Sequence, residues 1–256
     1  MQELPDIAIV VPAHNEALNL APLIDEIRAA LDTTLHEIIV VTLHEIIVVD
    51  DGSTDATAAV LADLARRAND LRVIRHARSC GQSAALITGI RAASARCIAT
   101  LDGDGQNDPA DIPALLERLQ RDDRTDSPLL VAGHRAHRQD VAMKRIGSRI
   151  ANSVRASVLG DATPDTGCGL KLFRRDPFLE LPRFDHMHRF LPALFLRAGG
   201  RVVSVPVNHR KRQAGRSHYG TLDRLAVGVV DLAGVWWLTR RWQRPEIVAG
   251  SPFAAE

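Results

Sequence analysis

Short apolar runs alternate with segments of helical periodicity along the first half of the chain. Runs typical of buried strands occupy residues 7–11, 71–75 and 97–101. Between them, apolar side chains recur at helical spacing, first at Leu20, Leu23, Ile24 and Ile27. Regular alternation of strands and helices predicts an α/β fold with a doubly wound, mostly parallel sheet flanked by helices, whose sites lie at the carboxyl ends of the strands.

The second half continues this alternation less regularly. Further helices are expected around Val60, Leu61 and Leu64 and at residues 82–95, 109–119 and 143–158, and further strands at residues 129–132 and 201–207. The sheet should therefore extend well beyond the first three strands.

One strand-like octapeptide, TLHEIIVV, occurs twice in succession, at residues 34–41 and 42–49. Because eight is an even number, both copies present the same side chains to each face of a sheet and could fill one strand position. Only the second copy runs directly into the acidic sequence DDGSTD. We therefore expect residues 45–49 to form the strand and residues 34–41 to be an insertion before it.

The overall composition fits one globular domain in a reducing compartment. The chain has 256 residues, of which 46% are hydrophobic, and a net charge of +1. A charge so close to zero argues against a general nucleic-acid-binding protein. Cys80, Cys97 and Cys168 show no metal-binding spacing, which favours reduced thiols. The first residues lack the basic region and long apolar stretch of a signal peptide and are expected to lead into the first strand.

The acidic sequence DDGSTD follows the strand expected at residues 45–49. Asp50 and Asp51 stand at its carboxyl end, where a carboxylate can accept hydrogen bonds from a ribose or a nucleobase. Asp55 is instead typical of the start of the next helix. No GxGxxG sequence follows the first strand, which counts against a dinucleotide-dependent dehydrogenase.

A second acidic sequence, DGDGQNDP, follows the strand expected at residues 97–101. Asp102 and Asp104 can hold a hard divalent cation that bridges a nucleoside diphosphate, and Gln106 could supply a third oxygen. The sequence begins like a calcium-binding EF-hand loop, but Asn107 and Pro113 stand where that loop requires glycine and glutamate. We therefore favour a divalent metal site over a calcium loop or a solvent-exposed turn.

Taken in order, VVPAHNE, VDDGSTD and LDGDGQNDP resemble the motifs of family 2 glycosyltransferases with the GT-A fold. Later stretches are similar to the polyprenyl-phosphate sugar transferases, whose type member is dolichyl-phosphate mannose synthase. These stretches are GHR at 133–135, KRIGSRIAN at 144–152, DTGCGLKLFRR at 165–175, HRFLPAL at 188–194 and RQAGRSHYG at 212–220. The resemblance covers about residues 5–240 and implies metal-dependent transfer of a sugar, with inversion, from a nucleoside diphosphate to a polyprenyl phosphate.

The resemblance also assigns roles by position. Residues that would lie against the nucleotide are Pro12, Asn15, Glu16 and Asp51. Residues that would bind Mg²⁺ or Mn²⁺ are Asp102, Asp104 and Gln106. Residues that would contact the acceptor phosphate are Arg135, Lys144 and Ser148, and those that would close over the donor diphosphate are Arg212 and Ser217.

The basic side chains suit a phosphate acceptor. A phosphate monoester is already anionic near neutral pH, with a second pKa of about 6, so it requires orientation and charge neutralisation more than deprotonation. A sugar hydroxyl would instead require a carboxylate base, and Asp165 is the nearest candidate by sequence. Two positions depart from the family pattern: His218 stands where many relatives have lysine, and Lys144 stands where arginine is common. A solvated helix face is the alternative explanation for the basic cluster around Lys144.

The apolar segment at residues 222–242 is expected to be a helix ending near Trp236, Trp237 and Trp242. It barely reaches the length of about 20 apolar residues that spans a bilayer, and Asp231 would lie in its middle. A helix lying at the membrane surface, anchored by tryptophan and arginine, fits better, and a core or dimer helix is the alternative. We thus expect a GT-A domain at residues 1–221, this helix at 222–242 and a loose tail at 243–256.

Together these features predict an enzyme that takes a GDP- or UDP-sugar as donor and a polyprenyl phosphate as acceptor. It would have no nucleic-acid partner and would act at the cytoplasmic face of the cytoplasmic membrane as a peripheral protein. Two alternatives stay open. One is a family 2 transferase that acts on a sugar hydroxyl in a polysaccharide or cell-envelope glycan, and the other is a non-catalytic module that only binds sugar nucleotides.

Overall fold

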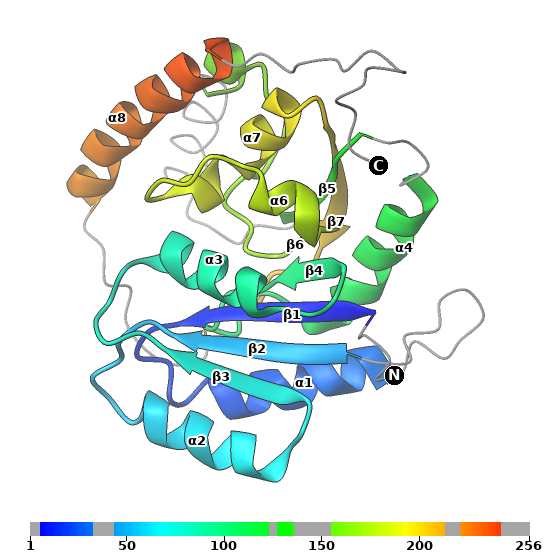
Figure 1. The fold of residues 1–256 in the computed structure, drawn as a ribbon, viewed down its shortest axis with the longest axis vertical. Helices are drawn as coiled ribbons and strands as arrows, with labels where there is room; N and C mark the ends of the chain where they lie inside the picture. Colours follow the sequence, from blue (N-terminus) through cyan, green and yellow to red (C-terminus); the bar gives the residue numbers. More distant parts are fainter. Residues whose placement is uncertain (1–5, 33–43, 123–126, 136–154, 213–220, 242–256) are drawn as a thin grey trace, which may run out of the picture.

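The computed structural model describes residues 6–32, 44–122, 127–135, 155–212 and 221–241, with the side chains of the last helix from residue 228 on. Within these residues one seven-stranded sheet has the order β3-β2-β1-β4-β6-β5-β7 (Figure 1). Its strands are β1 Ile7–Ala13, β2 His44–Asp50, β3 Leu71–Arg75, β4 Cys97–Thr100, β5 Leu129–Arg135, β6 Lys171–Arg174 and β7 Arg201–Val207.

Helices cover both faces of this sheet. One face carries α1 Leu20–Asp32, α2 Thr57–Arg67, the 3-10 turn η2 Pro109–Asp111 and α4 Ile112–Asp122. The other face carries α3 Gln82–Ala92, α6 Arg175–Leu179, the 3-10 turn η3 Met187–Arg189, α7 Leu191–Arg197 and α8 Thr221–Arg240. The result is a three-layer α/β/α arrangement.

The central strand β1 shows why the sequence forms a sheet buried on both faces. Ile7, Ile9 and Val11 pack among the apolar side chains of α1 and α4, whereas Ala8 and Val10 pack under α3. Because neighbouring side chains of a strand point to opposite faces, a continuous apolar run satisfies both layers. The helix α3 comes especially close, since a Cβ on Gly89 would lie 2.5 Å from Cγ1 of Val10.

The direction of the strands brings the polar motifs to one edge. Strand β1 is parallel to β2 and β4, with Ala13 opposite Asp50 and Val10 opposite Thr100. Within the described sheet only β6 is reversed, being antiparallel to both β4 and β5. The carboxyl ends of β1, β2, β4 and β5 therefore share an edge with the amino end of β6.

Most elements expected from the sequence are present. The helix predicted from Leu20, Leu23, Ile24 and Ile27 is α1, and the second octapeptide copy forms β2 as expected. The first copy, at residues 34–41, lies outside the described residues, as does most of the basic segment expected to be helical, although residues 155–159 are helical. Strand β6 was not predicted, because its sequence KLFR has only two apolar residues between two charged ones and so does not read as a buried apolar run.

The helix α8 coincides with the apolar segment expected near the end of the chain. Val235 is buried, whereas Val229, Val230, Trp236 and Trp237 are exposed on the opposite side of the helix. Asp231 is paired with His186, its Oδ2 lying 3.0 Å from Nδ1. No helix among the described residues is long and apolar enough to cross a bilayer. The expected loose tail lies outside them.

Candidate functional site

A cleft of about 740 Å³ opens where the ends of β1, β2 and β4 meet the start of α3. This volume is in the range of sites that bind small molecules and cofactors. The cleft is lined by seven of the residues singled out by the sequence: Pro12, Glu16, Asp51, Asp102, Asp104, Gln106 and Arg212. Motifs far apart in the chain therefore form one site.

One end of the cleft offers oxygen ligands for a divalent cation. Asp102, Asp104 and Gln106 all face it from the loop after β4. Burial, together with the neighbouring Asp104 carboxylate, raises the pKa of Asp102 to about 6. Two carboxylates and an amide form a donor set suited to Mg²⁺ or Mn²⁺, and a cation between them would relieve their mutual repulsion.

The Asp102 carboxylate is held in a tight space. A Cβ on Gly169 would lie 2.2 Å from Oδ2 of Asp102 and 2.3 Å from its Cγ, so that only glycine fits beside it. The backbone of Gly169 is itself fixed, because its carbonyl accepts a hydrogen bond of 2.7 Å from Oγ1 of Thr100 in β4. On its other side, Oδ1 of Asp102 accepts a hydrogen bond of 2.7 Å from Nε2 of Gln82, the first residue of α3.

A cation from the late part of the chain closes another side of the cleft. Arg212 forms an ion pair with Glu16, which follows β1, and Glu16 also accepts a hydrogen bond from Asn19. Burial raises the pKa of Glu16 above its usual value. The pair places a guanidinium at the edge of the cleft, where an anionic ligand could compete with Glu16 for it.

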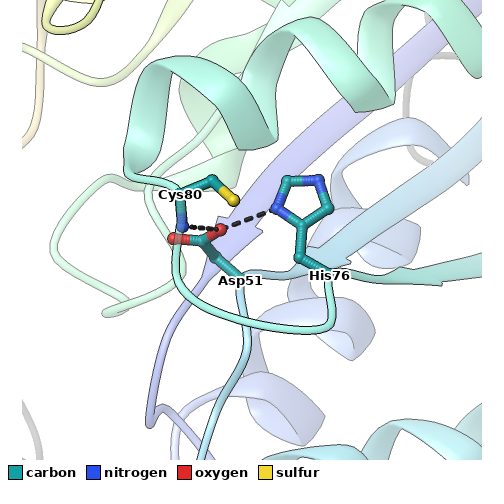
Figure 2. A group of neighbouring side chains, drawn as sticks. All are labelled: Asp51, His76 and Cys80. Carbon is teal, nitrogen blue, oxygen red and sulfur yellow. Dashed lines mark hydrogen bonds and ion pairs between the residues drawn. The ribbon is translucent and has the colours of Figure 1, made fainter.

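Another part of the cleft lining is organised by the carboxylate of Asp51 (Figure 2). Oδ1 lies 2.7 Å from Nδ1 of His76 and accepts from the backbone N–H of Cys80 at 2.8 Å. Oδ2 accepts from Oγ of Ser79 and from the N–H of Gly81, both at 2.8 Å. Burial alone would raise the pKa of Asp51, but these hydrogen bonds lower it below its usual value. We call these five residues the Asp51 network.

Three members of the Asp51 network also form a potential metal-binding group. Ligand atoms of Asp51, His76 and Cys80 lie within 4.8 Å of one another. Each is already engaged, however: Nε2 of His76 lies 3.0 Å from Oγ1 of Thr88, and the Cys80 thiol donates to the carbonyl of Arg78. Hydrogen bonding therefore accounts for this group without a metal, and the oxygen ligands beside Gln106 are the better cation site.

Asn15 and Asp50, both predicted to contact the nucleotide, hold loops together. Asn15 adopts a left-handed conformation with φ 57°. Its Oδ1 accepts from the backbone N–H of Thr54 at 2.9 Å, which joins the loop after β1 to the loop after β2. Oδ1 of Asp50 accepts from the N–H of Ser53 at 2.9 Å. Neither side chain is among those lining the cleft, so their contact with a nucleotide stays a prediction.

Arg135 and Asp165 form a bidentate ion pair at the end of β5. Nε of Arg135 lies 2.6 Å from Oδ2 of Asp165, and the second guanidinium contact, to Oδ1, is 2.8 Å. Only 13% of the Arg135 side chain and 5% of the Asp165 side chain are exposed. The proposed phosphate-binding arginine is therefore held rigid by the carboxylate that was the candidate base. The other predicted acceptor residues, Lys144 and Ser148, and the predicted donor residue Ser217 lie outside the described residues.

Two residues of the cleft and one buried lysine near it were not identified from the sequence. His14 and Gln82 line the cleft. Lys171 is buried at the start of β6, opposite Thr100, where its ammonium donates to the carbonyl of Cys168 and burial lowers its pKa. The lysine of the GCGLKLF sequence was the available signal, since a lysine within an apolar strand requires an internal partner.

The fold and the cleft define an α/β protein whose polar loops meet at the carboxyl edge of a mostly parallel sheet. The family described as Glycosyl transferase family 2 matches residues 8–181. The chain therefore belongs to glycosyl transferase family 2, and its fold is GT-A, as the motifs predicted.

Curated relatives support a narrower placement within the family. The chain is 35% identical over 251 residues to the dodecaprenyl-phosphate galacturonate synthase of Rhizobium johnstonii, covering 96% of this chain and 71% of that protein. It is 31% identical over 217 residues to the undecaprenyl-phosphate 4-deoxy-4-formamido-L-arabinose transferase of Edwardsiella ictaluri, covering 84% of this chain and 63% of that protein. The chain thus spans roughly two thirds of the length of these relatives.

A solved structure supports the fold. Glucosyl-3-phosphoglycerate synthase from Mycobacterium tuberculosis, in complex with Mn²⁺, UDP and glucosyl-3-phosphoglycerate, superimposes with a TM-score of 0.65 at 19% sequence identity. The match covers 92% of this chain and 80% of that one. At this identity the likeness establishes the fold alone.

Replacing Gly169 should disturb the cation site without unfolding the protein. The methyl group of Gly169→Ala requires the space that the Asp102 carboxylate occupies, so we expect Mn²⁺ affinity to fall about 10- to 100-fold. Gly234→Ala is the matched control, since a Cβ there meets no atom within 4 Å. Mn²⁺ binding can be followed by the electron paramagnetic resonance signal of the free ion. Equal affinities of the two variants would contradict this description of Asp102.

Metal binding should also weaken in acid. Asp102 with a pKa of about 6 takes up a proton as the pH falls through that value, and a protonated carboxyl is a poor metal ligand. The apparent dissociation constant for Mn²⁺ should be constant above about pH 7 and rise toward about tenfold per pH unit below pH 6. Titrations at pH 5, 6, 7 and 8 measure this, and a constant affinity across the series would refute it.

Proposed function

We propose that this chain transfers a sugar, with inversion, from a nucleoside diphosphate to a polyprenyl phosphate at a membrane surface, using Mg²⁺ or Mn²⁺. The single observation that carries the proposal is the cleft in which Asp102, Asp104 and Gln106 lie together with Arg212. Carboxylates that hold a divalent cation and an arginine at the rim are the groups that a sugar nucleotide diphosphate requires.

The donor occupies this cleft in the proposal. Asp102, Asp104 and Gln106 would hold the divalent ion, which when bound stabilises the negative charge of the departing nucleoside diphosphate. Arg212 would exchange Glu16 for the diphosphate, and Ser217 would close over it. The nucleoside would extend toward Pro12 and the Asp51 network. Mn²⁺ and UDP in the Mycobacterium tuberculosis structure support a donor of this chemical class, either a UDP- or a GDP-sugar.

A phosphate acceptor is favoured over a sugar hydroxyl by the state of Asp165. A general base needs an accessible carboxylate near the proton that it removes. Both oxygens of Asp165 are engaged by Arg135, and its side chain is almost fully buried. In the proposal Asp165 instead orients Arg135, which contacts the acceptor phosphate together with Lys144 and Ser148. Two relatives are named for polyprenyl-phosphate acceptors, which supports the same choice.

Contact with the membrane is assigned to α8. A polyprenyl chain stays in the bilayer, so its phosphate is presented at the surface. The exposed side of α8 carries Val229, Val230, Trp236 and Trp237, and the guanidinium of Arg240 lies 4.2 Å from the ring centre of Trp236. Aromatic and arginine side chains of this kind anchor helices at lipid interfaces. In Figure 1, α8 lies on the side toward which β1 and β2 point.

The state of the cysteines bears on the location in the cell. Cys80, Cys97 and Cys168, all among the described residues, form no disulfide, which suits a reducing compartment. We therefore place the protein at the cytoplasmic face of the cytoplasmic membrane, as a peripheral protein.

The enzymatic proposal is tested by removing one metal-binding carboxylate and varying the acceptor. Asp104→Asn should reduce sugar transfer on the order of 100-fold or more, because the charge stabilisation that depends on the metal is worth several kcal/mol. Labelled UDP- and GDP-sugars are offered with undecaprenyl phosphate or with free sugars, and lipid-linked and soluble products are separated by extraction.

The outcomes separate the three candidate functions. Transfer to undecaprenyl phosphate alone supports the proposal, and transfer to free sugars alone establishes the hydroxyl-acceptor alternative. If no acceptor is glycosylated while sugar nucleotides still bind, the chain is a binding module. Transfer that persists in Asp104→Asn would sink the metal-dependent mechanism.

The membrane contact is tested on α8. We expect Trp236→Ser with Trp237→Ser to weaken binding to vesicles containing anionic lipid about tenfold or more, since each indole loses on the order of 1 kcal/mol of apolar burial. Co-sedimentation with the vesicles measures this. The control is transfer to a short, water-soluble prenyl phosphate, which should be unchanged. Undiminished vesicle binding would exclude α8 as the anchor.

A further inference from the structure

The hydrogen bond between Gln82 and Asp102 joins two parts of the cleft. Nε2 of Gln82 donates to Oδ1 of Asp102 at 2.7 Å, and Gly169 packs against the same carboxylate. With an amide on one side and a glycine on the other, the Asp102 carboxylate cannot rotate freely. Because Gln82 donates to Oδ1, the other carboxylate oxygen, Oδ2, receives no hydrogen bond from this amide.

The start of α3 is itself fixed on several sides. The three residues that precede Gln82 are Ser79, Cys80 and Gly81, and each donates a hydrogen bond to the Asp51 carboxylate. A Cβ on Gly52 would lie 2.4 Å from the backbone carbon of Arg78, which shows how tightly this loop packs against the end of β2.

The next residue of α3 adds a further attachment. Oγ of Ser83 lies 2.8 Å from Nδ1 of His188, and it accepts the backbone N–H of His188 at 3.2 Å. Further along the helix, Gly89 packs against Val10 in β1. Gln82 therefore extends from a rigid element, and a side chain on a rigid element can hold a ligand group with little loss of order.

We propose that Gln82 is a positioning residue that orients Asp102 for the divalent cation and, through the Asp51 network, couples the nucleoside end of the cleft to its metal end. The inference rests on the proposed function, because it assigns the cation to Asp102. Hydrogen-bond donors to metal-binding carboxylates typically contribute 10- to 100-fold to metal affinity. No contact between Gln82 and substrate is required.

Coupling is a direct consequence of this arrangement. A nucleotide that packs against Ser79 and Gly81 restrains the residues next to Gln82, which fixes the Asp102 carboxylate further. By linkage, a cation that restrains Asp102 should improve nucleotide affinity by the same factor. Removing the amide should therefore lower both the affinity for Mn²⁺ and the mutual enhancement between Mn²⁺ and UDP.

The experiment compares Gln82→Met with the wild-type chain. Methionine has nearly the length of glutamine but donates no hydrogen bond. Mn²⁺ is titrated by electron paramagnetic resonance, alone and with saturating UDP, and UDP is titrated by calorimetry with and without Mn²⁺. We expect Mn²⁺ affinity to fall about tenfold and the enhancement of UDP affinity by Mn²⁺ to shrink. Gln120→Met, on an exposed position of α4, is the matched control and should change neither.

Unchanged Mn²⁺ affinity in a folded Gln82→Met protein would overturn the inference. If that variant does not fold, Gln82→Ala removes the same donor with a residue that favours helices, and the same criterion applies. Failure of the proposed function has a different signature. In that case Mn²⁺ does not bind the wild-type chain, or it binds Asp104→Asn with equal affinity. The inference about Gln82 is then wrong together with the proposed function. If Asp104→Asn loses Mn²⁺ and Gln82→Met retains it, only the inference is wrong.

Discussion

The parallel pairing of β1 with β2 and β4 is the constraint on which the rest of the structure depends. Its register sets Ala13 beside Asp50 and Val10 beside Thr100, so three loops begin at one edge of the sheet. Burial of β1 on both faces holds this register, because a shift of one residue would exchange the side chains facing α1 with those facing α3. Reversal of β6 then brings its amino end, at Lys171, to the same edge, where Gly169 packs against Asp102.

The acidic residues of the motifs divide into two groups with different tasks. Asp102 and Asp104 face the cleft, and their carboxylates repel each other. A bound cation would reduce this electrostatic repulsion. Asp50 and Asp51 instead accept hydrogen bonds from surrounding loops, and Asp51 has its carboxylate surrounded by four donors. The second group builds a rigid frame for the first, and Gln82 is the point at which the two groups meet.

Prediction from the sequence succeeded where a pattern is local. The apolar runs and helical spacings identified β1, α1, β3 and β7, and the strand ends identified the polar loops that meet at the cleft. It failed at β6, whose two apolar residues stand between two charged ones, and at Gln82 and Lys171. The roles of these two residues come from neighbours 20 or more positions away or from burial, neither of which leaves a periodic signal.

The sequence by itself determined the fold class and the family, because periodicity and ordered motifs are properties of the chain. It also predicted the residues that would hold a cation. The sequence also indicated that the second octapeptide copy forms β2, since only that copy leads directly into Asp50 and Asp51. Tertiary structure alone decided that Asp165 is engaged by Arg135, that Arg212 reaches Glu16 and that Gln82 holds Asp102. Those contacts depend on the relative positions of separate loops, which are fixed only when the sheet and its helices pack together.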